Sequence, residues 1–177
     1  RALVGVIRQE ADRINARVQQ FVTFARPPAL QPSVVSLGPW LEGIVAALAP
    51  SAALKPVALS LDVARAGQAG IDAEQLRQAV ENLVRNAIDA TPAGGRIEVA
   101  ALSSRDGHRI SVGDTGAGIA PDVLPRIFDL YFTTKREGTG VGLAVSQQIV
   151  AAHHGRLEVE SEPGAGATFT IVLPHMP

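Results

Sequence analysis

Apolar side chains recur in a heptad pattern over the first 26 residues. One heptad position holds Val4, Ala11, Val18 and Ala25, and a second holds Ile7, Ile14 and Phe21. A repeat of 3.5 residues predicts a helix whose apolar seam packs against a partner helix. We therefore expect residues 1–26 to form a bundle helix that dimerises. An amphipathic helix packed on its own domain is the alternative, because the pattern lasts only about three heptads.

A proline-rich segment must end this helix. Pro27, Pro28 and Pro32 remove backbone donors and bias the residues before them away from helical angles. We expect residues 27–36 to be a linker and residues 37–174 to form one domain.

Beyond the linker, helical and alternating patterns follow one another. The pattern predicts helices over 37–48, 72–91, 121–131 and 143–152, and strands over 57–63, 96–103, 108–114, 156–161 and 168–173. Asp72 is the expected N-cap of the second of these helices, with Gln75 at capping-box spacing.

The helix over 72–91 carries polar side chains beside its apolar face. At about 100° per residue, Asn82, Asn86 and Asp89 fall within one arc of ~60°, while Glu81 and Arg85 point farther outward. Asparagine is a poor helix former, so two in one helix interior favour a function. Satisfied amides at the edge of the core are the alternative.

The strand predicted over 108–114 ends in a carboxylate, on the strand face that is otherwise apolar. Ile110, Val112 and Asp114 share one strand face, so Asp114 points toward the core, and Gly116 and Gly118 follow it. A buried carboxylate needs a partner, and glycines let a ligand approach the backbone. A turn aspartate with tight-turn glycines is the alternative.

Alternate glycines open the last predicted helix. Gly138, Gly140 and Gly142 precede an apolar run, and Lys135 lies just before them. Bare N–H groups at the positive end of a helix suit a phosphate. The spacing matches neither the P-loop nor the dinucleotide fingerprint.

Composition narrows the classes of function. The chain has 177 residues, 46% hydrophobic and 19% charged, with a net charge of −1 and no cysteine. This is a globular profile without a basic field for nucleic acid, and it excludes disulfides, thiolate metal sites and cysteine nucleophiles. No continuous apolar run reaches the roughly 18 residues of a membrane helix. Because the chain starts without Met, we expect it to be a fragment.

In their order along the chain, these motifs resemble a known family. Residues 81–87 (ENLVRNA) look like an N box, 114–118 (DTGAG) like a G1 box, 128–135 like an F box, 138–142 like G2 and 164–169 like G3. The sequence thus resembles the catalytic ATP-binding domain of bacterial two-component sensor histidine kinases. Residues 10–28 look like the end of the second dimerisation helix of that family.

The resemblance implies a fold. It is an α+β, two-layer sandwich, with a mixed sheet covered on one face by helices, the ATP-binding fold shared with gyrase-type ATPases. One long bundle helix precedes it. The short connection between Phe132 and Gly140 resembles the short lid of nitrogen-sensing kinases.

The resemblance also implies roles for individual residues. Asp114 would accept a hydrogen bond from adenine, Asn86 would bind Mg²⁺ and Asn82 would support its shell, while Lys135 would hold phosphate and Glu81 is a candidate base. The catalytic set implied is Asn82, Asn86, Lys135 and Glu81, and the implied ATP site comprises Asn82, Arg85, Asn86, Asp89, Asp114, Gly116, Gly118, Ile119, Phe132, Thr133, Lys135, Gly138, Thr139, Gly140, Val141, Gly142, Leu143 and Thr168.

The implied reaction is transfer of the γ-phosphate of ATP to a histidine. An amide such as Asn82 cannot take a proton from water at neutral pH, which favours transfer over rapid hydrolysis. The phosphoacceptor histidine of the first dimerisation helix is absent from this chain, and His108, His153, His154 and His175 lie far from the predicted bundle helix.

The implied partners are a second copy of the kinase and a response regulator receiver domain, and the implied location is the cytoplasm. The alternatives are an anti-sigma-type serine kinase of the same fold, which inactivates a sigma factor by binding it, and a non-catalytic nucleotide-sensing interaction module.

Overall fold

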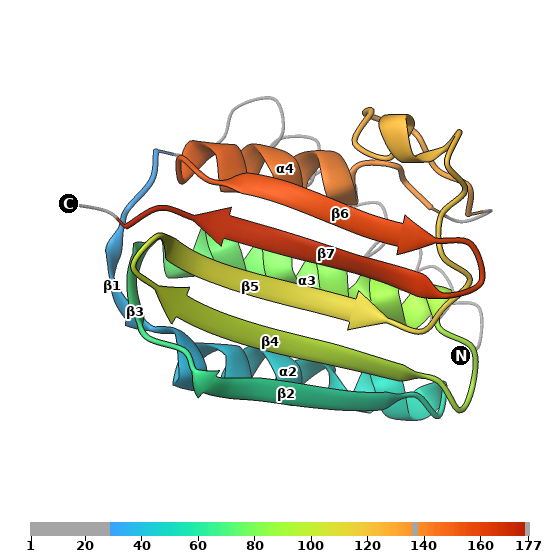
Figure 1. The fold of residues 1–177 in the computed structure, drawn as a ribbon, viewed down its shortest axis with the longest axis horizontal. Coiled ribbons are helices and arrows are strands. Elements are labelled where there is room, and N and C mark those ends of the chain that lie inside the picture. The colour runs from blue at the N-terminus through green and yellow to red at the C-terminus, as the bar shows by residue number, and fades with distance from the viewer. Residues whose placement is uncertain (1–28, 136–137, 176–177) are drawn as a thin grey trace, which may run out of the picture.

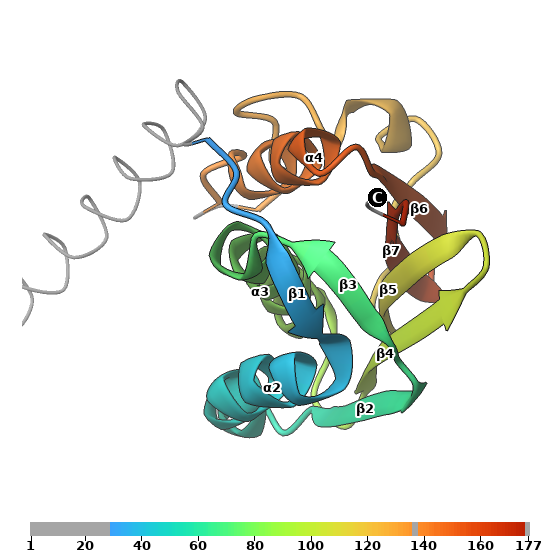
Figure 2. The same cartoon turned by 90° about the vertical axis from the view of Figure 1, so that its left-hand side faces the viewer.

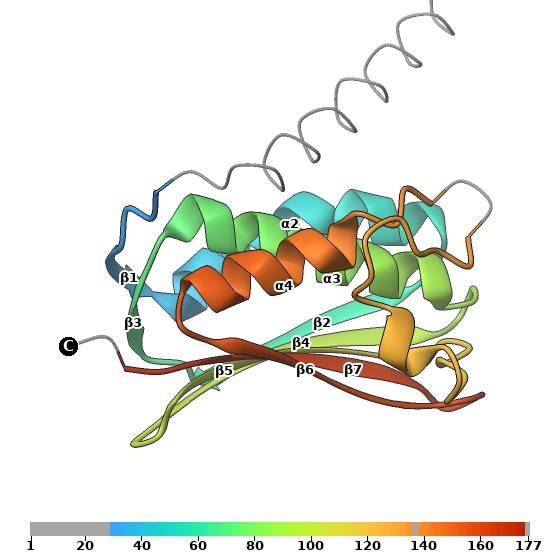
Figure 3. The same cartoon turned by 90° about the horizontal axis from the view of Figure 1, so that it is seen from above.

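The computed structural model describes residues 29–135 and 138–175, and in this part of the chain three α-helices cover one face of a five-stranded mixed sheet (Figures 1 and 3). The helices are α2 (Leu37–Leu54), α3 (Ala73–Ala90) and α4 (Gly142–Ala152). The predicted two-layer α+β fold is confirmed. The predicted bundle helix over 1–26 lies outside the described residues.

The large sheet has the strand order β2-β4-β5-β7-β6. Its strands are β2 (Ala58–Arg65), β4 (Arg96–Ser104), β5 (Gly107–Asp114), β6 (Arg156–Glu162) and β7 (Gly166–Leu173). Only β2 runs parallel to its neighbour, β4, and the other pairings are antiparallel. Because alternate residues of a strand face opposite ways, Ile97, Val99, Ile110, Val112 and Ile171 all lie buried under the helices.

The predicted cap of α3 is present. Both the Glu74 and Gln75 backbone N–H groups donate to Asp72 Oδ1, at 3.2 and 3.0 Å. The same carboxylate accepts from the backbone N–H of Gln31 at 2.9 Å, and the Asp72 N–H donates to His153 Nε2 at 3.0 Å. One residue thus joins the start of the described chain to the start of α3 and the end of α4.

A second, two-stranded sheet was not predicted. Its strands, β1 (Ser33–Ser36) and β3 (Gln68–Ile71), pair antiparallel (Figure 2). We assigned residues 33–36 to the linker, but the structure pairs them with a strand more than thirty residues later. Each strand has four residues, too few to show an alternating pattern in the sequence.

The predicted helix over 121–131 is wrong. The structure has only a 3₁₀ turn, Leu124–Arg126. Pro125 lacks an N–H and its ring clashes with the preceding turn, which disfavours a longer helix around it. By contrast α2 runs six residues past its predicted end at residue 48, through Pro50.

Among the described helices, α2 is long and apolar enough, by length and composition alone, to cross a membrane. Leu37, Leu41, Ile44 and Leu48 on one face of α2 are nevertheless fully buried in the core. This stripe at helical spacing is typical of a helix that packs on a sheet.

Candidate functional site

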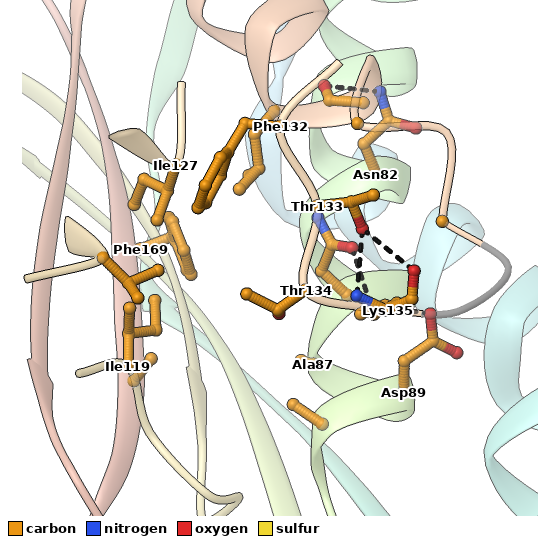
Figure 4. Close-up of a pocket in the computed structure, with 18 of the residues that line it drawn as sticks. Asn82, Ala87, Asp89, Ile119, Ile127, Phe132, Thr133, Thr134, Lys135 and Phe169 are labelled. Carbon is orange, nitrogen blue, oxygen red and sulfur yellow. Dashed lines mark hydrogen bonds and ion pairs between the residues drawn. The ribbon is translucent and has the colours of Figure 1, made fainter. Parts of the chain in front are cut away.

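A cavity of about 860 Å³ lies between α3, the start of α4 and the ends of β5 and β7. The loop between β5 and α4 forms its remaining side. Figure 4 shows two unlike walls: Ile119, Ile127, Phe132 and Phe169 gather on one side, and polar side chains from α3 and the loop lie on the other. Such a cavity can take a ligand with a flat apolar part and a charged part.

Asp114 stands at the end of β5 within this cavity. The Gly116 N–H donates to Asp114 Oδ1 at 2.8 Å. Burial raises the pKa of Asp114 above its ordinary value, although hydrogen bonds from the backbone of Gly116 and Ala167 and the charge of Lys135 act in the opposite direction. A half-buried acceptor of this kind is well suited to bind a donor on a ligand.

The polar wall begins with Asn82 on α3. Its Nδ2 lies 3.3 Å from the carbonyl oxygen of Gly142, in the first turn of α4. This contact ties the asparagine face of α3 to the glycine-rich start of α4.

Farther along α3, Asn86 and Asp89 both contact the ammonium group of Lys135. Lys135 Nζ lies 3.0 Å from Asn86 Oδ1 and 2.8 Å from Asp89 Oδ2. The two side chains are three residues apart, so they share one helix face and reach the same cation.

Two glycines let the loop fold over the cavity. Gly118 and Gly140 have positive φ angles of +67° and +65°. A Cβ at Gly118 would collide with the Glu162 carbonyl, and one at Gly140 with the backbone of Tyr131. The loop is further held by Arg126, whose guanidinium lies 4.4 Å from the ring centroid of Phe132.

The structure brings most of the predicted site residues together around this cavity. Those that line it are Asn82, Arg85, Asn86, Asp89, Asp114, Gly118, Ile119, Phe132, Thr133, Lys135, Gly138, Thr139, Gly140, Gly142 and Leu143. They come from four separate parts of the sequence, which local patterns alone could not place side by side.

Four predicted residues do not line the cavity. Thr168 lies between Ala167 and Phe169, which do line it, so the pleat of β7 turns Thr168 to the other face of the sheet. Glu81 is not among the lining residues, and its carboxylate lies 3.9 Å from the guanidinium of Arg85, four residues later. Val141 is buried in the core, and Gly116 contributes its N–H to Asp114 rather than a surface to the cavity.

Several residues that line the cavity were not predicted. They are Ala87, Ala90, Ala120, Val123, Ile127, Thr134, Ala167 and Phe169. Ala167 and Phe169 alternate with Thr168, so the strand period could have identified them. Val123 and Ile127 were hidden by the incorrect helix prediction.

The residues present fit a magnesium ion carried by phosphate. Among the described residues, no group of three or more His, Cys, Asp or Glu could hold a metal alone. Asn86 Oδ1 accepts a hydrogen bond from a cation, the ammonium group of Lys135. Mg²⁺ takes oxygen ligands and is usually bound by few protein groups together with phosphates and water.

This fold and cavity define the chain as an ATP-binding domain of the type shared by histidine kinases and gyrase. Residues 71–177 match the family described as "Histidine kinase-, DNA gyrase B-, and HSP90-like ATPase", and the chain belongs to this family.

Its relatives include named kinases. The chain is 40% identical over 175 residues to the sensor histidine kinase ZraS of Escherichia coli (strain K12), covering 97% of this chain and 37% of that protein. It is 37% identical over 176 residues to the signal transduction histidine-protein kinase AtoS of the same organism, covering 98% of this chain and 29% of that protein. The chain thus spans about a third of the length of these relatives.

Solved structures agree with this assignment. Full-length ShkA in complex with AMPPNP superposes with a TM-score of 0.90 and 32% identity, covering 98% of this chain and 38% of that chain. Histidine kinase ThkA in complex with response regulator protein TrrA has a TM-score of 0.82 at 22% identity, covering 98% of this chain and 51% of that chain, a likeness of fold alone. The predicted resemblance to the ATP-binding catalytic domain of sensor histidine kinases is confirmed.

Proposed function

We propose that the cavity binds Mg²⁺–ATP with adenine against Asp114 and the triphosphate at the start of α4. The observation that carries this proposal is the shared cavity of Asp114, the glycine-rich start of α4 and Lys135. The complex of ShkA with AMPPNP, a relative of similar fold, supports it.

Adenine is the base that matches the acceptor at Asp114. The exocyclic amine of adenine donates to a carboxylate, whereas guanine presents a carbonyl oxygen there and two acceptors repel. The apolar wall of Ile119, Ile127 and Phe169 covers the flat faces of a base.

The phosphates belong at the other end of the cavity. The first turn of α4 starts at Gly142, and its N–H groups have no partners within the helix. These groups and the ammonium of Lys135 offset phosphate charge, the main requirement in phosphoryl transfer. Arg85 lines the same side of the cavity and is a further phosphate contact.

Asn86 is the protein ligand we assign to Mg²⁺, with Asn82 supporting the shell. When bound, the ion neutralises charge on the phosphates as the γ-phosphate leaves. Lys135 Nζ lies 3.0 Å from Asn86 Oδ1, so the lysine and Mg²⁺ compete for this oxygen.

We further propose that the whole protein transfers the γ-phosphate to a histidine on a helix outside this chain. The names of the relatives support a histidine as acceptor. The next acceptor we propose is a response regulator aspartate, in the cytoplasm. A kinase of the same fold, ThkA, has been solved in complex with a response regulator protein, TrrA. The heptad pattern over 1–26 supports a homodimer.

A phosphotransfer assay tests the reaction. The chain, radiolabelled ATP and Mg²⁺ are mixed with the helix pair of the whole protein. Acid-labile, base-stable phosphate on that helix is expected. Acid-stable phosphate on a partner protein would indicate a serine kinase instead, and ATP binding without transfer would indicate a nucleotide sensor.

A further inference from the structure

Ser146 is a fully buried hydroxyl within the apolar helix α4. Its Oγ lies 2.9 Å from the Gly142 carbonyl oxygen one turn earlier, and 3.4 Å from the Ala79 carbonyl oxygen on α3. Carbonyl oxygens only accept, so one of them takes the single hydroxyl hydrogen. Ser146 can therefore offer only its lone pairs to a third group.

That third group is the side-chain amide of Asn82. Asn82 Nδ2 lies 3.4 Å from Ser146 Oγ and 3.3 Å from the Gly142 carbonyl oxygen. If the amide were flipped, its oxygen would face the Gly142 carbonyl, which can only accept, and Ser146 could donate to it only by giving up its shorter bond of 2.9 Å to that carbonyl. The NH₂ end must therefore face α4, which leaves Oδ1 for the cavity that Asn82 lines (Figure 4).

We propose that Ser146 is a positioning residue that, with the Gly142 carbonyl, holds the amide oxygen of Asn82 toward the metal. This inference rests on the proposed function. An amide without this restraint could turn its NH₂ toward the cation, and an NH₂ group repels Mg²⁺. The first turns of α4 thus act on the site through Asn82 as well as through their own N–H groups.

Ser146→Ala tests the proposal through the Mg²⁺ dependence of ATP binding. We expect ATP affinity in EDTA to stay within about twofold of the unsubstituted chain, and the Mg²⁺ concentration for half-maximal tightening to rise about two- to tenfold, the effect of one lost neutral hydrogen bond. Ile149→Val is the matched control, because Ile149 is buried in the same helix and its apolar side chain offers no acceptor to the amide of Asn82. It should lose similar stability without changing the Mg²⁺ requirement.

The same measurement in an Asn82→Ala background decides whether Ser146 acts through Asn82. We expect Ser146→Ala to cause no further change there. An equal change in both backgrounds would overturn the proposal, and so would a Ser146→Ala chain that behaves like Ile149→Val.

A nuclear magnetic resonance measurement needs no variant at 146. The side-chain NH₂ signals of Asn82, assigned by their loss in Asn82→Ala, should exchange with solvent more slowly than those of exposed asparagines. Exchange at the rate of exposed amides would overturn the proposal even if Ser146→Ala did not fold. Failure of the proposed function looks different, because the unsubstituted chain would then bind ATP without regard to Mg²⁺, or not at all.

Discussion

Lys135 Nζ lies 2.8 Å from the carboxylate of Asp89, so the cation we assign to phosphate pairs with a carboxylate of α3. The side chains of Lys135 and Asp89 are 41% and 60% exposed, which makes this a surface ion pair of modest strength. An ammonium group has three hydrogens to donate, and Asn86 and Asp89 take two of them, so phosphate meets a cation that is already paired. Asp89 therefore competes with the nucleotide for Lys135.

The first prediction concerns this competition. Asp89→Asn should raise ATP affinity in EDTA about two- to fivefold, because an exposed ion pair of roughly 0.2–1 kcal/mol no longer opposes binding. Titration calorimetry measures the change. Removing a negative charge near the triphosphate would also raise affinity, so the comparison needs a second background.

Lys135→Met supplies that background. If Asp89 acts by holding Lys135, Asp89→Asn should improve binding much less in the Lys135→Met chain. An equal gain in both backgrounds would show that Asp89 acts only by general repulsion of phosphate.

The second prediction concerns the base. Asp114→Asn should lower ATP affinity about tenfold or more, because a charge-assisted hydrogen bond is lost, and should bring the affinities for ATP and GTP close together. Competition binding with both nucleotides measures the ratio. Undiminished preference for ATP would remove Asp114 from base recognition.

The third prediction concerns the metal. Asn86→Ala should weaken ATP binding at least about tenfold in Mg²⁺ and much less in EDTA, because only the metal-bound complex uses the amide oxygen. Calorimetry in each buffer provides the comparison. Equal losses in Mg²⁺ and EDTA would contradict the assignment of Asn86 as a metal ligand.

The fourth prediction follows from the burial of Asp114. Burial raises the pKa of Asp114 above 3.8, so its acceptor is lost at a higher pH than an ordinary aspartate would lose it. ATP affinity should therefore fall as the pH drops through this raised pKa. The Asp114→Asn chain provides the control, since any pH dependence that it retains comes from ATP or other groups.

Local sequence patterns predicted those parts of the site whose geometry one element determines. The arc of Asn82, Asn86 and Asp89 follows from helical periodicity, and the inward direction of Asp114 follows from strand alternation. The glycines before α4 marked a turn that only small residues can form.

Contacts between distant segments could not be predicted in this way. The pairing of β1 with β3 and the position of Phe169 opposite α3 depend on how the layers assemble. The partner of Lys135 is likewise absent from any local pattern, because Asp89 lies 46 residues earlier on another element. The position of Glu81 outside the lining could not be predicted for a related reason, since a helix position beside Asn82 does not by itself face the cavity.

The last prediction concerns Asp72, which caps α3 and binds the backbone of Gln31. Burial alone would raise the pKa of Asp72, but the hydrogen bonds from Gln75, Gln31 and Glu74 outweigh it and lower the pKa below 3.8. A carboxyl with a depressed folded-state pKa adds stability above the unfolded pKa and loses it as the pH falls through the folded one. Asp72→Ala should therefore destabilise the chain by about 0.5–2 kcal/mol at pH 7 and by less near pH 3, as measured by urea unfolding.

Asp72→Asn is the control, since asparagine keeps the helix cap but cannot titrate. The stability of the Asp72→Asn chain relative to the Asp72→Ala chain should not change with pH. A difference between the aspartate and alanine chains that stayed constant from pH 7 to pH 3 would show that the charge of Asp72 adds nothing beyond the cap.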